Sequence, residues 1–125
     1  MDKAYEIILL NTMGCAYFDT TDELISDVAS AAQLFSTVKY ESNINRIALR
    51  REAVCADFFD LSNGMAPAIL IKFAPKHYKF GLVGDFSDLE GTKFGRFIER
   101  CNGGDDMFFG SDKDAILKRL ANATS

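Results

Sequence analysis

The chain has 125 residues and a mass of 13.9 kDa; 48% of its residues are hydrophobic and 26% are charged. This length and balance indicate one globular domain over residues 1–125, and they exclude a disordered chain or a two-domain enzyme. The formal net charge of −4 excludes the basic field that nucleic-acid binding requires, and it disfavours binding to anionic membranes.

The longest unbroken aliphatic run, Ile7–Leu10, is far shorter than the roughly 20 residues of a membrane span. It is also too short for the apolar region of a signal peptide. The three cysteines, Cys15, Cys55 and Cys101, are odd in number and lack CxxC spacing, which favours free thiols over a disulfide framework or a zinc site. The sequence therefore predicts a cytoplasmic protein.

The first predicted elements are two strands, over Tyr5–Leu10 and Cys15–Phe18, joined by a turn. Apolar residues then recur at spacings of three and four, which predicts a helix with one apolar stripe. Thr20 with Glu23 three residues later forms a capping-box pattern and predicts the helix start. The stripe comprises Leu24, Val28, Ala32, Phe35 and Val38.

The rest of the chain alternates strands and helices in the same way, with glycine and proline between them. The predicted strands are Arg46–Val54, Lys79–Gly84 and Met107–Phe109. The first predicted helix runs over Leu61–Phe73, with Pro67 in its first turn and Pro75 closing it. The next runs over Phe94–Cys101 and ends in a left-handed Asn102-Gly103-Gly104, and a final helix is capped by Ser111.

The predicted order is β-β-α-β-α-β-α-β-α, which indicates an α/β fold. Such alternation predicts a mixed, mostly parallel sheet of four or five strands with about four helices packed on it. Ligands of such sheets bind outside the carboxyl ends of the strands. Polar residues follow those ends and are expected to share one acidic, hydroxyl-rich rim: Asp19, Thr20, Thr21, Asp22, Asp57, Asp60, Ser62, Asn63, Gly64, Asp85, Ser87, Asp88, Ser111 and Asp112.

The rim residues have two interpretations, one functional and one structural. Its carboxylates could hold a divalent cation, with Asp57, Asp60 and Asp85 as candidate ligands, or could dock a basic partner. The same residue types also cap helix starts, and every rim segment precedes a helix. The sequence singles out no metal site, no catalytic residue and no cofactor.

Other motifs carry weaker signals. The segment Gly91–Gly95 has a glycine, a threonine and a lysine near a helix start but lacks the phosphate-loop spacing. His77, the single histidine, is predicted in a surface loop at the opposite end of the sheet from the rim. Arg46, Arg50 and Arg51 flank one strand and are expected at a solvated edge. Adjacent phenylalanine pairs would place one ring on each face, which could expose aromatic surface to a partner.

Several motifs resemble a bacterial family known as domain of unknown function 4180. They are Asp57–Gly64 (DFFDLSNG), Leu70–Phe73 (LIKF), Leu82–Ser87 (LVGDFS), Phe97–Asn102 (FIERCN) and Met107–Phe109 (MFF). The resemblance covers nearly the whole chain in collinear order. It implies no established activity.

The order of elements also resembles that of STAS domains, which include the anti-sigma-factor antagonists. That resemblance implies a STAS-like fold and a phosphorylation switch at the start of the helix after the third strand. Ser62 or Asn63 falls at that place, so Ser62 is a possible phosphorylation site if it is the equivalent residue. An ordinary helix cap is the other reading of Ser62.

Three hypotheses follow. The first is a small cytoplasmic, STAS-like regulatory module that binds a protein partner or a small ligand at the rim, chiefly through Asp57, Asp60, Ser62, Asn63, Gly64, Asp85 and Ser87. The second is a metal-dependent enzyme or a nucleotide-binding protein that uses the acidic rim. The third is a homo-oligomeric structural subunit, a homodimer for example, formed through an edge strand or exposed phenylalanines.

Overall fold

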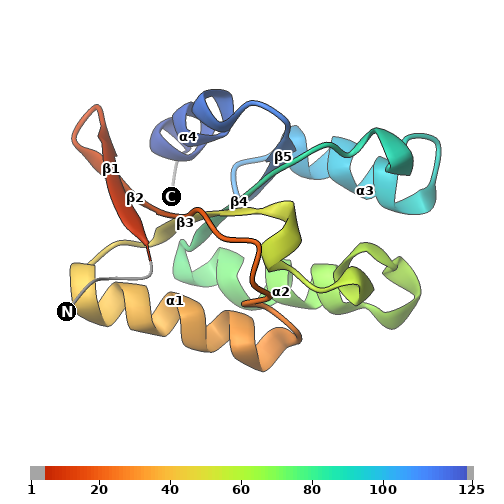
Figure 1. Ribbon diagram of the computed structural model, residues 1–125, viewed down its shortest axis with the longest axis horizontal. Helices are drawn as coiled ribbons and strands as arrows, with labels where there is room; N and C mark the ends of the chain where they lie inside the picture. Colours follow the sequence, from red (N-terminus) through yellow and green to blue (C-terminus); the bar gives the residue numbers. More distant parts are fainter. Residues whose placement is uncertain (1–4, 124–125) are drawn as a thin grey trace.

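A computed structural model describes residues 5–123 (Figure 1). Its sheet has five strands in sequential order, from β1 to β5. The strands are β1 (Glu6–Leu10), β2 (Met13–Phe18), β3 (Arg46–Arg50), β4 (Lys79–Val83) and β5 (Met107–Gly110). The β1–β2 pair is antiparallel and the other pairs are parallel.

Four helices complete the fold: α1 (Val28–Ser42), α2 (Met65–Phe73), α3 (Lys93–Asn102) and α4 (Lys113–Asn122). The α/β class, the mixed sheet and the order β-β-α-β-α-β-α-β-α are confirmed. No helix within residues 5–123 has the length and apolar character needed to cross a bilayer.

The helices form two layers around the sheet. Consecutive parallel strands that lie side by side, joined by right-handed crossovers, place their helices on the same face. Accordingly α1, α2 and α3 share one core with the sheet, and α4 packs on the other face; α1 and α4 lie on opposite sides of the sheet in Figure 1.

Strand residues alternate between the two cores, as the period of two requires. Phe109 belongs to the larger core and its neighbour Phe108 to the core under α4. All eleven phenylalanines are buried or half-buried, so the expected exposed phenylalanine surface is absent. The exposed large apolar side chains among residues 5–123 are Ile7, Leu9, Tyr40 and Ile71.

The start of α1 differs from the prediction. Asp27, not Thr20, is the N-cap: its carboxylate accepts a hydrogen bond from the Ser30 amide at 2.7 Å, and the Ser30 hydroxyl accepts one from the Asp27 amide at 3.1 Å. Leu24 lies outside the helix, because the segment that precedes α1 is held by a part of the chain that is distant in sequence. Ile25 forms an isolated parallel bridge with Val54.

Other boundaries also shift. The third strand ends at Arg50, and the chain then forms a 3-10 turn over Arg51–Ala53. The helix expected from Leu61 starts at Met65, with Pro67 in its first turn as predicted.

Two helix caps differ from the predictions as well. Gly103 closes α3 with a right-handed φ of −84°, so the predicted left-handed ending is wrong. Asp112, rather than Ser111, caps α4, and its carboxylate accepts hydrogen bonds from the amides of Asp114 and Ala115.

Arg46 is not at a solvated edge, as the sequence suggested, but 4% exposed beneath the end of α4. Its Nε donates to the Leu120 carbonyl at 2.7 Å and its Nη2 donates to the Ala123 carbonyl at 2.9 Å. The last carbonyls of a helix lack intrahelical partners and carry the negative end of the helix dipole. The buried guanidinium therefore satisfies the C-terminus of α4 and ties it to β3.

Gly81 allows α4 to lie directly against the sheet. A Cβ atom on this residue would lie 2.7 Å from the Ile116 Cγ2 and 3.0 Å from the Leu120 Cδ1. Both side chains are buried in the core under α4, so neither can move freely into solvent. A larger residue at this position must push the helix outward.

Replacing Arg46 with methionine should lower the free energy of unfolding by about 3 kcal/mol, because it leaves buried helix carbonyls without donors. Urea denaturation measures the change. The matched control is Arg50→Met, whose side chain is 40% exposed and whose removal should cost less than about 0.5 kcal/mol. Equal losses in the two variants would contradict the role assigned to Arg46.

Replacing Gly81 with alanine should destabilise the fold by about 1–3 kcal/mol through overpacking under α4. Gly104→Ala is the control, because a Cβ there meets its nearest neighbour, the Cys101 carbonyl oxygen, at an ordinary 3.6 Å. Thermal unfolding of both variants checks this, and an unchanged melting temperature for Gly81→Ala would show that α4 does not pack this closely.

Candidate functional site

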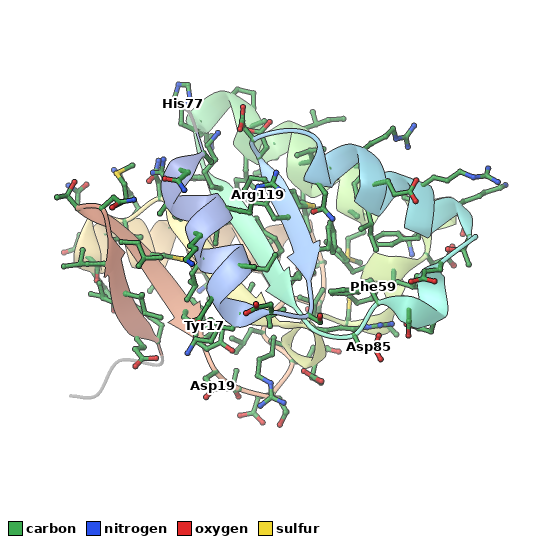
Figure 2. All side chains as sticks on the ribbon, turned by 90° about the horizontal axis from the view of Figure 1, so that it is seen from above. Tyr17, Asp19, Phe59, His77, Asp85 and Arg119 are labelled. Atoms are coloured by element: carbon green, nitrogen blue, oxygen red, sulfur yellow. The ribbon has the colours of Figure 1, made fainter. Side chains whose placement is uncertain are left out.

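The carboxyl ends of β2 to β5 lie at one edge of the sheet. Figure 2 places Asp19 and Asp85 at this edge, with Tyr17 and Phe59 nearby, and His77 at the opposite end of the molecule. His77 is exposed in a loop with a positive φ of 62°, in agreement with the predicted surface position.

The chain leaves two neighbouring strands in opposite directions at this edge. After β4 it runs to α3 on one face, and after β5 it runs to α4 on the other. Open α/β sheets bind ligands where adjacent connections diverge in this way. A cavity of about 620 Å³ opens there, within the range of small-molecule sites. We call it the β4–β5 crevice; its strand-end walls are Gly84, Asp85, Phe86, Ser87, Gly110 and Ser111.

The other wall comes from the start of α3 and the loop before it. Gly91, with a φ of +79°, and Gly95 line the crevice. A Cβ on Gly95 would lie 2.3 Å from the Leu89 carbonyl oxygen, so the helix and loop approach as only glycine allows. The Thr92 hydroxyl accepts a hydrogen bond from the Gly95 amide at 3.0 Å and donates one to the Leu89 carbonyl. This threonine is thus a helix cap, and Lys93 is not among the lining residues.

The ionisable lining of the crevice is mostly acidic. Asp85, Glu90 and Glu99 contribute three carboxylates, against the one guanidinium of Arg96. The Asp85 carboxylate accepts a hydrogen bond from the Ser87 amide at 2.9 Å, and this bond lowers the Asp85 pKa. The local charge therefore favours a cationic or neutral polar ligand over a phosphate.

A second hollow, of about 460 Å³, shares Asp85 and is built around Arg51. The Arg51 guanidinium lies 4.8 Å from the ring centre of Phe59 and 5.1 Å from that of Phe86. It donates to both carboxylate oxygens of Asp88, at 2.7 and 3.0 Å, and to the Asp85 carbonyl. The hydrogen bond from Arg51 lowers the Asp88 pKa. Arg51 thus joins the loops that follow β3 and β4.

The Asp57–Gly64 segment builds the turn into α2 and does not line the β4–β5 crevice. Asp60 accepts hydrogen bonds from the Ser62 hydroxyl at 2.7 Å and the Ser62 amide at 3.0 Å, which lower the Asp60 pKa. Asn63 donates to the Asp57 carbonyl and accepts from the Met65 amide. Gly64 supplies the positive φ of 75° that starts the helix.

Of the fourteen predicted rim residues, the crevice therefore brings together Asp85, Ser87 and Ser111. The first two belong to the seven residues expected to do most of the binding. Phosphorylation of exposed Ser62 stays a prediction; a phosphate there would replace the hydroxyl's hydrogen bond to Asp60 and add negative charge beside it. Sequence reasoning missed the roles of Glu90, Arg96 and Glu99. No local spacing marks these three residues, because the close approach of Gly95 to Leu89 that brings them to the crevice is a tertiary contact.

No group of three or more His, Cys, Asp or Glu side chains within residues 5–123 is placed to hold a metal ion. The candidate ligands Asp57, Asp60 and Asp85 accordingly do not form such a group. The three cysteines are free thiols. Burial raises the pKa of Cys15 to about 12 and that of Cys101 to about 11, which leaves both thiols protonated at neutral pH.

No curated protein and no solved structure matches the chain. A family model described as a domain of unknown function, DUF4180, matches residues 10–120. This match begins at the last residue of β1 and covers β2 to β5, the residues that line the β4–β5 crevice and most of α4. The chain belongs to the DUF4180 family.

Proposed function

We propose that the chain is a small cytoplasmic binding module with a STAS-like arrangement of elements, and that it binds a small ligand in the β4–β5 crevice. One observation carries the proposal: a cavity of small-molecule size coincides with the point where the connections after β4 and β5 diverge. Support for the compartment comes from the three free thiols, and support for the STAS-like type comes from the order of elements.

The proposed ligand carries an amine or several hydroxyl groups rather than a phosphate. The carboxylates of Glu90 and Glu99 are exposed side chains of the crevice wall, and Asp85 adds a third charge at the strand end. An ammonium group would gain charge-assisted hydrogen bonds from them, whereas a phosphate would face a net negative lining. Phe86, Ile98 and Phe109 supply apolar surface for the carbon skeleton.

A protein partner is the second candidate. The Arg51 hollow favours it, because a guanidinium that lies over the neighbouring Phe59 and Phe86 rings, beside an exposed acidic loop, offers a surface of mixed character. A binding module of this kind regulates its partner by occupancy and needs no catalytic group. Ser62, on the nearby turn into α2, is the proposed place for phosphorylation to adjust such an interaction.

A thermal-shift panel of amino acids, polyamines, amino sugars and polyols tests the ligand proposal. A ligand at one hundred times its dissociation constant should stabilise the fold by about 2.7 kcal/mol. Glu99→Gln should weaken binding of an amine hit about tenfold, because it removes one charge partner from the crevice.

The matched control for that panel is Glu23→Gln, which removes a charge from an exposed side chain outside the crevice. It should bind the hit like the wild type. A panel without hits, or a hit that Glu99→Gln binds unchanged, would contradict the crevice proposal, and in the second case would place the ligand elsewhere.

The rival hypothesis, a metal-dependent enzyme or a nucleotide-binding protein, is tested by the same thermal-shift measurement. Mg²⁺, Mn²⁺ and nucleoside triphosphates should leave the melting temperature unchanged, because the candidate carboxylates do not converge and the crevice is acidic. A rise with Mg²⁺ or Mn²⁺ that disappears in Asp85→Asn would revive the metal hypothesis.

A further inference from the structure

The two outermost strands of the sheet, β1 and β5, differ in whether their free side is blocked. At β5, the side chain of Asn102 occupies the edge: its Oδ1 accepts the Phe109 amide at 2.8 Å and its Nδ2 donates to the Phe109 carbonyl at 3.1 Å. The carboxamide thus takes the place that another strand would fill. Blocking of this kind is how proteins prevent sheets from joining edge to edge.

The β1 edge carries no comparable block within residues 5–123, where β1 pairs with β2 alone. Asn11 and Thr12 form a two-residue turn, with φ values of 51° and 66°. The residues that flank such a turn, Leu10 and Met13, form a hydrogen-bonded pair, and hydrogen-bonded pairs then alternate along the ladder. The N–H and C=O groups of Ile7 and Leu9 therefore point away from β2.

The side chains at this edge are apolar and open. Ile7 is 43% exposed and Leu9 is 69% exposed, on the same face of the strand. No lysine, proline or bulge interrupts Glu6–Leu10, and these are the usual protections of an edge strand. The edge therefore presents unpaired backbone groups together with exposed apolar side chains.

We propose that β1 pairs with β1 of a second copy of this chain, antiparallel about a two-fold axis at Ile8, to form one continuous sheet. In this register Ile7 lies opposite the second copy's Leu9, so the outward groups of both residues pair and their side chains meet. The two Ile8 residues lie opposite each other. Each Glu6, the one charged residue of β1, lies opposite Leu10 and not opposite the other Glu6.

The self-complementarity of this register is what selects a second copy as the occupant. A two-fold interface places the same patch of each partner against itself, so a patch with a charge at its centre repels its copy. Here the charge lies at the end of the strand and the centre is apolar. An unrelated strand would satisfy the backbone groups equally but would gain nothing specific from the Ile7 and Leu9 pairing.

Sedimentation velocity of the full chain over a range of concentrations tests the proposal, with Leu9→Lys as the main variant. The wild type should reach twice the 13.9 kDa monomer mass, and Leu9→Lys should raise the dimer dissociation constant at least tenfold. Leu9→Pro should do the same by removing an outward N–H, while it leaves the pairing with β2 intact. Ile71→Lys, at a 73% exposed position on α2, is the control and should dimerise normally.

Amide exchange separates an interface effect from misfolding. The Ile7 and Leu9 amides should exchange more slowly as the wild-type concentration rises, and the melting temperature of the dilute Leu9→Lys monomer should equal that of the dilute wild type. A wild type that stays monomeric, a dimer that survives both Leu9 variants, or a dimer lost only in Ile71→Lys would overturn the proposal.

Discussion

Three crossovers between parallel strands run in the same direction along this sheet, and the common hand that such connections take determines on which face each helix lies. Because β2, β3, β4 and β5 are neighbours in sequence and in space, α1, α2 and α3 share one face. The opposite face would be left bare, and α4 has to cover it. The chain therefore crosses from one face to the other after β5, and the β4–β5 crevice lies where that crossing parts from the connection to α3.

The same constraint explains why Arg46 is buried. With a single helix over one face, the C-terminus of α4 lies across the parallel strands, and its carbonyls face the sheet instead of water. Arg46 at the start of β3 meets them with a charge that suits the helix dipole. Lys79, at the start of neighbouring β4, is likewise buried and is paired with Asp106 at 3.0 Å. Both cations lie at the amino end of the sheet, far from the acidic crevice.

Local patterns predicted the fold well because each depends on neighbours in sequence. Glycine and proline marked the ends of elements, and the alternation of strands with helical stripes indicated the mostly parallel sheet. The start of α1 could not be read in this way. Thr20 with Glu23 is as good a capping pattern as Asp27 with Ser30, and a long-range bridge between Ile25 and Val54 decides between them.

The lining of the β4–β5 crevice could be predicted only in part, for a similar reason. Strand ends located this edge of the sheet, where Asp85 lines the crevice, whereas Asp57, Asp60 and Ser62 lie in the entry to α2. Glu90 and Glu99 reach the crevice because Gly95 lets α3 approach Leu89 closely, which is a tertiary contact. Nothing in local spacing distinguishes such carboxylates from a solvated helix face.

The link from Arg46 to Leu120 joins residues 74 positions apart, and it has a consequence for how the chain folds as it is made. The face formed by Tyr17, Ala48 and Phe108 has no cover until α4 has been synthesised. The growing chain therefore carries an uncovered apolar sheet face from the synthesis of β3 until that of α4, and exposed apolar surface of this kind makes a nascent chain prone to aggregate. Closure over so long a loop also makes the docking of α4 a slow and late event in folding.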